Sequence, residues 1–272
     1  TYTTTVKANG IEVTAATSGQ WDSNGEEQVT SDIIYTAADL KPGDYFYRTT
    51  GNEWAVSDGG LRKIYADGTT KWESDKTPDN NKGTCIGIVL KVGRDTEGSW
   101  ADNGDYTLKG STISMSEVHG YVLALRDANG GNSCQWGSYE KVDCDRNQDT
   151  GFNGYSSTQT IVAFNEDKNW NLSDAFPAAY YATTGYEAQY PAPANTSGWF
   201  LPSGGQCQYW LNHKDIILRS IQNAGGDRWK DGYWSSSEYS RSPTYRAYFL
   251  HVSHGDMGND YKVNSRAVRA CL

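Results

Sequence analysis

Apolar and polar residues alternate over the first 21 positions, on either side of an Asn9-Gly10 pair. Alternation of this kind is typical of a strand with one buried face, and Asn-Gly is a preferred pair for a hairpin turn. We therefore expect two strands that end near Trp21. Residues 22–32 are polar and contain Gly25, which indicates a linker. The sequence predicts a domain boundary there, between residues 1–32 and 33–272.

Short apolar runs beyond this boundary predict strands more often than helices. Each run is four to eight residues long and lies between polar or glycine-containing segments, as expected of strands. The predicted strands are 44–48, 85–92, 121–128, 233–240, 245–252 and 266–272.

Helical signals lie between these strands. Pro177 suits the first position of a short helix over 176–181. Ser203 and Gln206 have the spacing of a capping box, and Cys207, Trp210 and Leu211 then fall on one helical face. A second set, Ile217, Leu218 and Ile221, ends at Gly225-Gly226. Strands, two or three short helices and further strands, in that order, predict an α+β fold.

The amino-acid composition indicates the compartment in which the protein acts. The chain has 19 Tyr and 10 Trp but 6 Phe and 2 Met, and this usage is typical of strands and binding surfaces. We expect an extracellular protein. The formal net charge is −9 and no run of Lys or Arg is present, so a nucleic-acid partner is not expected. The longest apolar stretch, 85–90, is too short to cross a bilayer, so no transmembrane segment is expected, and any secretory signal is expected to lie outside this chain.

Three segments carry a resemblance to a known family. They are GWFLPSGGQ (198–206), GYWSSSEYS (232–240) and SRAVRACL (265–272), preceded by Asp127-Ala128 and by FPAAYYA (176–182). Together they resemble the surface-protein branch of the C-type-lectin-like fold, which occurs in bacterial cell-surface lipoproteins and pilin-tip proteins. The resemblance covers residues 40–272. In addition, YTTTVKANGIEVT resembles the last strands of a fimbrillin-type pilin domain.

The resemblance implies a non-enzymatic adhesin at the cell surface or at a pilus tip. Its expected location is extracellular, on the outer membrane surface or in a fimbrium. Its expected partners are a protein or glycan ligand on another cell or on a host surface, and other pilin subunits. A structural pilin or fimbrial subunit is the alternative function.

The five cysteines allow two disulfides. The resemblance implies that Cys207, on the capped helix, bridges to Cys271, on the last strand. Two buried thiols are the alternative, because sequence does not give the distance between them. Cys134 and Cys144 flank a Trp136-Gly137 turn and could close a small loop. Cys85 lies in an apolar strand and is expected in the core.

A calcium site is not expected. In the resembled family, sugar-binding calcium sites use Glu-Pro-Asn or Gln-Pro-Asp and Trp-Asn-Asp, and none of these occurs here. One weak candidate has four oxygen ligands at alternating positions, namely Asp143, Asp145, Asn147 and Asp149. The EF-hand template requires Gly at Gln148 and Glu at Gly154, so a solvated acidic turn is favoured. No cofactor is expected.

Enzyme signatures are incomplete. The four histidines, His119, His213, His251 and His254, form no HExxH pair, and Ser235 to Ser237 lack the Gly-x-Ser-x-Gly frame of a nucleophile elbow. GWFLPSGGQ is also similar to a helix entry in formylglycine-generating enzymes. Those enzymes need a pair of reactive cysteines near the C-terminus, where Cys271 stands alone. Catalysis is therefore not expected.

Residues 239–261 are the predicted binding segment. Strand alternation places Tyr245, Ala247 and Phe249 on a core-like face and Arg246, Tyr248 and Leu250 on an exposed face, followed by a polar loop. Its mixture of Tyr, His, Asp, Asn, Ser and Gly is typical of antibody binding loops. Trp234 is expected beneath it as a buried scaffold residue. The main anchors would be Tyr245, Arg246, Tyr248 and Tyr261. The candidate ligand-binding residues are Arg241, Thr244, Arg246, Tyr248, Leu250, His251, Ser253, His254, Asp256, Gly258, Asn259, Asp260 and Tyr261.

The same segment resembles the variable region of proteins diversified by a retroelement that mutates adenines. Such mutagenesis of AAC codons does not produce Lys, Glu, Gln, Met or Trp. Between Tyr239 and Tyr261 only Met257 belongs to that set. An ordinary strand and polar turn in a non-diversified adhesin is the alternative.

Overall fold

The computed structural model describes residues 41–57, 61–64, 70–73, 77–78, 81, 83–145 and 151–272, together with two N-terminal strands. The chain divides into two compact units, 1–36 and 37–272. In the first unit, β1 (Thr5–Ala8) and β2 (Ile11–Thr14) pair antiparallel. The predicted hairpin is thus confirmed, although its second strand ends earlier than expected. The predicted linker, 22–32, lies outside the described residues.

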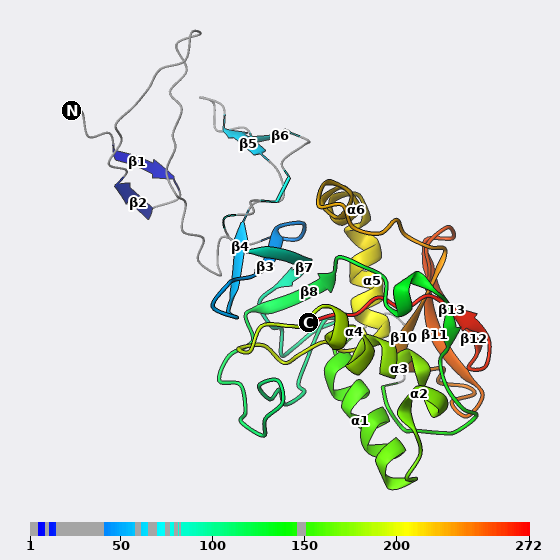
Figure 1. The fold of residues 1–272 in the computed structure, drawn as a ribbon. Helices are drawn as coiled ribbons and strands as arrows, with labels where there is room; N and C mark the ends of the chain where they lie inside the picture. Colours follow the sequence, from blue (N-terminus) through cyan, green and yellow to red (C-terminus); the bar gives the residue numbers. More distant parts are fainter. Residues whose placement is uncertain are drawn as a thin grey trace. The chain divides into compact units, whose positions relative to one another are not determined.

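The larger unit contains two main antiparallel sheets (Figure 1). The four-stranded sheet has the order β4 (Trp54–Ser57), β3 (Tyr45–Arg48), β7 (Thr84–Val92), β8 (Gly120–Ala124). The three-stranded sheet has the order β10 (Gly232–Glu238), β11 (Arg246–His251), β12 (Asp256–Tyr261). Two further pairs are β5 (Leu61–Ile64) with β6 (Thr70–Glu73), and β9 (Cys134–Gln135) with β13 (Ser265–Arg266).

Six α-helices are present among the described residues, besides a short 3-10 helix at Asn129–Gly131. They are α1 (Gly154–Asp167), α2 (Leu172–Ala175), α3 (Pro177–Ala182), α4 (Thr184–Gln189), α5 (Gly204–Asn212) and α6 (Lys214–Asn223). The α+β class, with antiparallel sheets and several short helices, is confirmed. α3, α5 and α6 were predicted. α1 was not, because its buried face carries Ser157, Thr158 and Asn165 beside Ile161 and lacks the apolar stripe that marks an amphipathic helix.

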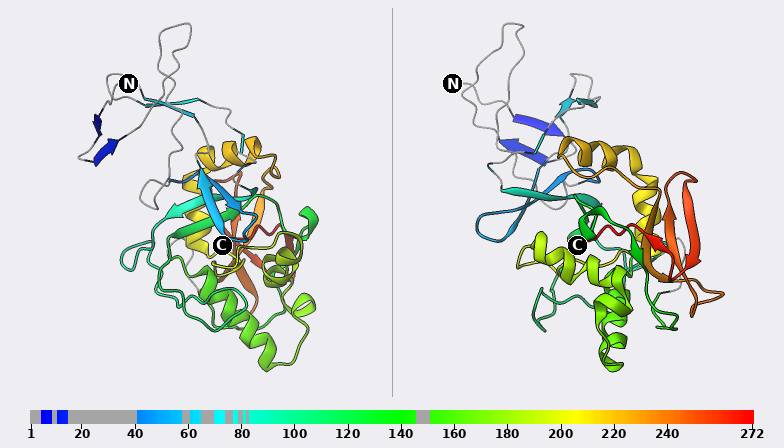
Figure 2. Two further views of the ribbon diagram at one scale, coloured as in Figure 1. Left: turned by 60° about the vertical axis from the view of Figure 1, so that its left-hand side comes forward. Right: turned by 45° about the vertical axis from the view of Figure 1, so that its right-hand side comes forward.

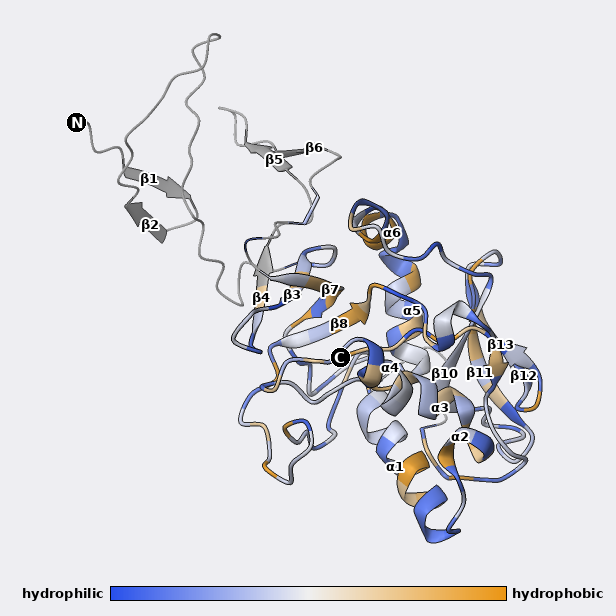
Figure 3. Cartoon of the chain, viewed as in Figure 1, coloured by the Kyte–Doolittle hydropathy of each residue, from blue (hydrophilic) through white to orange (hydrophobic). Residues whose placement is uncertain are grey.

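α5 lies between the two sheets (Figure 1). The predicted capping box is formed: the Ser203 hydroxyl accepts from the Gln206 amide, and the Gln206 side chain accepts from the Ser203 amide. Trp210 and Leu211 then pack in one core with residues of both sheets, including Leu90 and Leu250. α6 contacts β7, and it carries both hydrophilic and hydrophobic positions in Figure 3. Positive φ at Gly225 accompanies its end.

The last predicted strand is shorter than expected. β13 covers only Ser265–Arg266, and the chain beyond it makes isolated bridges. Cys271 bridges both Leu123 of β8 and Phe200, so the segment is inserted between two parts of the fold. None of the helices among the described residues has the length and apolarity needed to span a membrane.

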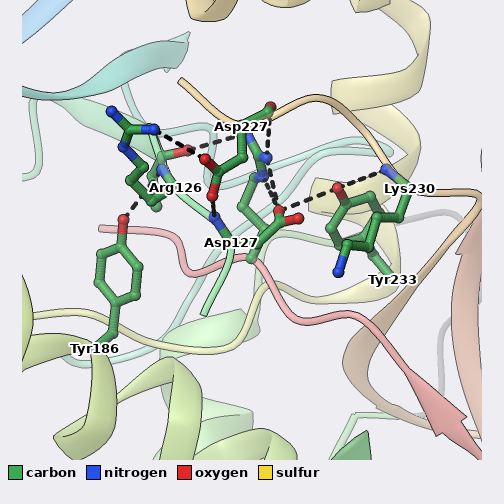
Figure 4. A network of polar contacts seen from close by, with 8 residues as sticks. Arg126, Asp127, Tyr186, Asp227, Lys230 and Tyr233 are labelled. Carbon is green, nitrogen blue, oxygen red and sulfur yellow. Dashed lines mark hydrogen bonds and ion pairs between the residues drawn. The ribbon is translucent and has the colours of Figure 1, made fainter. Parts of the chain in front are cut away.

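A buried polar network fixes this C-terminal segment. The Arg269 guanidinium lies 2.6 Å from Asp127 Oδ1, and both side chains are buried. Tyr233 donates to the same oxygen at 3.1 Å, and the Asp127 amide donates to Asp227, which also pairs with Arg126 (Figure 4). Since Asp127, Tyr233 and Arg269 all belong to the motifs of the family resemblance, these motif residues act here as scaffold.

Candidate ligand-binding surface

The predicted binding segment forms a β-hairpin. β11 and β12 pair through six registered positions, from Arg246 opposite Tyr261 to His251 opposite Asp256. The sequence predicted a polar loop after His251, but only the turn at 252–255 is a loop. The right-hand view of Figure 2 shows these strands, in orange and red, at the edge of the unit.

Both faces of β11 are covered by other parts of the protein. The prediction that Tyr248 and Leu250 are exposed is therefore wrong. Tyr248 is 4% exposed and Leu250 is 0% exposed, because they pack in the same core as Trp210 of α5. Ala247 and Phe249 are buried on the opposite face together with Trp234, as predicted. The run of four apolar residues, Ala247–Leu250, was the available signal, since a continuous apolar run is typical of a strand buried on both sides.

Gly258, one of the predicted binding residues, lies where a side chain would disturb packing. It lies opposite Phe249, and a Cβ built on Gly258 would fall 2.6 Å from the Phe249 ring. The Arg266 guanidinium also packs on that ring, at 3.2 Å from the ring centroid. Gly258 therefore makes room for a buried aromatic ring.

One end of the hairpin carries exposed tyrosines; we call it the tyrosine patch (Tyr139, Tyr245, Arg246, Asn259 and Tyr261). Tyr139, Tyr245 and Tyr261 are 43%, 51% and 45% exposed. The Tyr139 and Tyr245 rings meet edge to face at 5.3 Å. Arg246 lies over the Tyr261 ring at 4.3 Å and donates to Asn259 Oδ1 at 2.9 Å. Apolar rings beside a guanidinium and an amide form a surface suited to recognition.

Sequence reasoning missed Tyr139. It named Tyr245 as an anchor but placed it on the core-like face; β11 begins at Arg246, so strand alternation does not extend to Tyr245, which is exposed. Tyr139 lies between β9 and α1, and no local pattern distinguishes it from other surface tyrosines. The tertiary fold alone brings it to Tyr245.

The other end of the hairpin carries a histidine pair; we call it the histidine end (Asp231, His251, Ser253, His254 and Asp256). The His251 and His254 rings stack at 3.7 Å, and His251 Nε2 lies 3.4 Å from Asp231. Hydrogen bonds from the Ser253 side chain and amide, together with the nearby His251 and His254, hold the pKa of Asp231 below its ordinary value. Asp231, His251, Ser253 and His254 are thus engaged with one another.

The two ends form separate surfaces. Five residue steps separate Arg246 from His251 along β11, which is about 17 Å at the rise of an antiparallel strand.

Asp260 lies near the tyrosine patch and binds the Arg266 guanidinium at 2.6 Å. Burial raises the pKa of Asp260, but hydrogen bonds from Asn264, the Tyr261 amide and Arg266 lower it more, so its pKa is below the ordinary value. Two other predicted binding residues lie in the turn before β11: Arg241 is exposed and Thr244 is half-buried.

The tyrosine patch rests on a buried ion pair. Lys262, directly after Tyr261, lies 2.7 Å from Glu238 at the end of β10, and both side chains are fully buried. Glu238 also accepts from the amides of Val142 and Asp143, and Lys262 lies over the Trp136 ring at 4.1 Å. The segment that contains Tyr139 and the hairpin are therefore held together beneath the patch.

Neither predicted disulfide is formed. All five cysteines are free thiols. Cys144 donates to the Ser236 carbonyl at 3.2 Å, whereas Cys134 lies on β9 opposite Arg266. Cys207 and Cys271 are both fully buried, and burial, with a smaller contribution from the proximity of Cys271, raises the pKa of Cys207. Burial raises the pKa of Cys85 and of Cys134 to about 12.

The two described residues of the weak calcium candidate bind different protein partners. Asp143 pairs with Lys141 at 3.0 Å, and Asp145 accepts from Ser237 at 2.7 Å. Asn147 and Asp149 lie outside the described residues. Within the described part of the chain, no group of three or more His, Cys, Asp or Glu side chains is placed to hold a metal ion.

The chain is similar to fimbrial proteins of Bacteroides ovatus ATCC 8483. Fim1C of that strain, which carries the name of a fimbrium tip subunit, is 26% identical over 269 aligned positions that cover 81% of this chain and 46% of the relative. A crystal structure titled as a fimbrial protein matches with a TM-score of 0.53 and 19% identity, over 85% of this chain and 48% of that one. No family model matches.

These likenesses have two consequences. The structural match shows that the fold is shared with a fimbrial protein. The chain spans about half the length of both proteins that it matches.

Proposed function

We propose that this chain is part of a fimbrial tip subunit that binds a ligand, without catalysis, through the tyrosine patch. The observation that carries the proposal is that one end of the hairpin holds two exposed aromatic contacts, Tyr139 against Tyr245 and Arg246 over Tyr261. Tyr and Arg contribute most to affinity at interfaces because they bury large areas at a low entropic cost. The buried Lys262–Glu238 pair lies next to the patch and ties the residue after Tyr261 to the end of β10.

The similarity to a protein named as a fimbrium tip subunit supports the location. We infer an extracellular position at the cell surface or in a fimbrium, with other pilin subunits as partners. A C-type-lectin-like fold stays part of the proposal, supported by the capped helix α5 and by the motif residues in the Asp127 network. The ligand would be a protein or a glycan on another surface.

A non-enzymatic role is supported by the thiols. A formylglycine-generating type of enzyme needs two reactive cysteines that substrate can reach. Cys207 and Cys271 do lie near each other, but both are fully buried and burial raises the pKa of both. A buried thiol with a raised pKa is a poor nucleophile.

We also propose that a retroelement diversifies this segment, but at fewer positions than the sequence alone suggested. Tyr248, Leu250, Met257 and Gly258 are buried or needed for packing, so they would be held constant. The exposed residues of the two hairpin ends would vary. The neighbouring DNA tests this: a reverse transcriptase gene with a near-repeat of the 3′ end of this gene is the expected finding.

The ligand proposal is tested by comparing the two ends of the hairpin. One variant replaces Tyr139, Tyr245 and Tyr261 with Ser; its matched control replaces His251, His254 and Asp256 with Ser. Both are applied, with the parent protein, to arrays of glycans and surface proteins. We expect the tyrosine variant to lose binding by at least about tenfold, because aromatic anchors dominate interface energies, and the control to keep it.

Two results would contradict the proposal. Loss of binding in the control alone would move the site to the histidine end. No array ligand for the parent protein, with normal incorporation into fimbriae, would favour a structural subunit. Binding that survives chelation with EDTA is expected for either location, since the proposed surface uses no metal.

A further inference from the structure

A cavity of about 470 Å³ lies beside the four-stranded sheet, among residues that the tyrosine patch does not use. Phe46 and Trp54, which stack at 6.0 Å, contribute to one part of its lining. Tyr121 and Val122 of β8 and Leu272 contribute to another, and Met115 comes from the segment before β8. Small-molecule sites in proteins have this size and this concave, mostly apolar character.

Three polar residues of the buried wall are already bonded within the protein. Tyr106 and Tyr121 both donate their hydroxyl protons to the buried Asp102 carboxylate, the latter at 2.6 Å. Lys91 Nζ lies 3.1 Å from Asp95 and also reaches the carbonyls of Val92 and Gly93. The ammonium group of Lys91 and the hydroxyls of Tyr106 and Tyr121 are therefore engaged within the protein rather than free for a ligand.

The lining also contains exposed polar residues. Ser114, Ser116, Glu117 and Asn195 all belong to it and are exposed. His119 pairs with Glu117 at 3.6 Å and packs against the Trp54 ring at 5.8 Å. The carboxylate of Glu117 disfavours an anionic ligand, whereas serine hydroxyls and an amide suit a neutral polar group.

From these observations we infer that the cavity is a second binding site, which takes an uncharged small molecule with an aromatic or branched apolar skeleton. Burial of such a skeleton against Phe46, Trp54 and Val122 is favourable in proportion to the apolar area removed from water. A buried charge would meet no free partner among Lys91, Tyr106 and Tyr121, so its desolvation would not be offset. Half-buried Met115 gives the lining some adaptability.

The test is a fluorescence titration with two related probes. N-phenyl-1-naphthylamine is neutral, and 8-anilinonaphthalene-1-sulfonate carries a negative charge on a similar skeleton. We expect the neutral probe to bind saturably at one site per chain, and the sulfonate to bind at least about tenfold more weakly. Met115→Trp should fill the cavity and weaken the neutral probe by at least about tenfold.

Controls separate the cavity from other surfaces. Tyr139→Ala, in the tyrosine patch, should leave binding of the neutral probe unchanged. The probe result is therefore independent of whether the tyrosine patch binds a ligand. Thermal unfolding checks that Met115→Trp is folded; if it is not, Val118→Phe at another lining position provides the same test. Equal binding of both probes, or equal binding to parent and filled variant, would overturn the inference. So would the absence of saturable binding of the neutral probe.

Discussion

Lys262 and Glu238 form an ion pair at 2.7 Å in which neither side chain is exposed to solvent. Burial lowers the pKa of Lys262, and the Glu238 carboxylate opposes this change. The pair joins the end of β10 to the residue that follows β12. It therefore couples the stability of the larger unit to the geometry of the tyrosine patch.

Lys262→Met should destabilise the protein by roughly 3 to 5 kcal/mol, because it leaves the Glu238 carboxylate buried without a counter-charge. Urea unfolding measures this change. The double variant Lys262→Met with Glu238→Gln is the control, since it removes the uncompensated charge and should recover part of the loss. A single variant as stable as the parent would show that the pair contributes little.

Tyr248 and Tyr261 should respond in opposite ways to truncation. Tyr248→Ala removes a buried ring and should cost roughly 3 to 5 kcal/mol of unfolding free energy. Tyr261→Ala changes an exposed ring and should alter stability by less than about 0.5 kcal/mol. Thermal melts of the two variants make the comparison. If both unfold the protein equally, the tyrosine patch is part of the core.

Gly258→Ala should destabilise the hairpin. The added methyl group would meet the Phe249 ring, on which the Arg266 guanidinium also packs, and overpacking of this kind costs about 1 to 3 kcal/mol. Ser253→Ala, in the exposed turn, is the control with little expected change. Phe249→Leu should relieve the clash, so an unchanged penalty in that background would locate the strain elsewhere.

Stability should fall as the pH is lowered below about 3.8, partly through Asp227. Burial raises the pKa of Asp227, but the Asp127 amide and Arg126 lower it more, so its pKa in the folded protein is below the ordinary value of 3.8. A carboxyl with a lowered folded pKa stabilises above the unfolded value and loses this contribution as the pH falls through the folded one. Asp227→Asn should reduce the difference in unfolding free energy between pH 5 and pH 3, by less than about 1 kcal/mol because the side chain is partly exposed. An unchanged difference would exclude Asp227 from the acid response.

Thiol titration tests the state of the cysteines. Buried protonated thiols react poorly, so Cys134, Cys144, Cys207 and Cys271 should resist Ellman's reagent in the native protein, and half-buried Cys85 should react slowly. After denaturation without reductant, five thiols should react. A count of three would instead reveal one disulfide, and peptide mapping would show whether it joins Cys207 to Cys271.

The sequence alone determined the local elements of this protein. The Asn9-Gly10 hairpin, the Ser203–Gln206 capping box and the apolar stripe of α5 were all predictable, because each depends on hydrogen bonds or periodicity within a few neighbouring residues. The alternation of β11 also assigned Ala247 and Phe249 to one face and Tyr248 and Leu250 to the other.

Only the tertiary structure decided what covers each face and which surfaces meet. α5 packs over the side of β11 that alternation left to solvent, so Tyr248 and Leu250 become core residues. Tyr139 joins Tyr245 because Glu238 binds the amides at Val142 and Asp143 as well as Lys262. Burial and adjacency depend on partners that are distant along the chain, and no local pattern of residues specifies which distant segment will arrive.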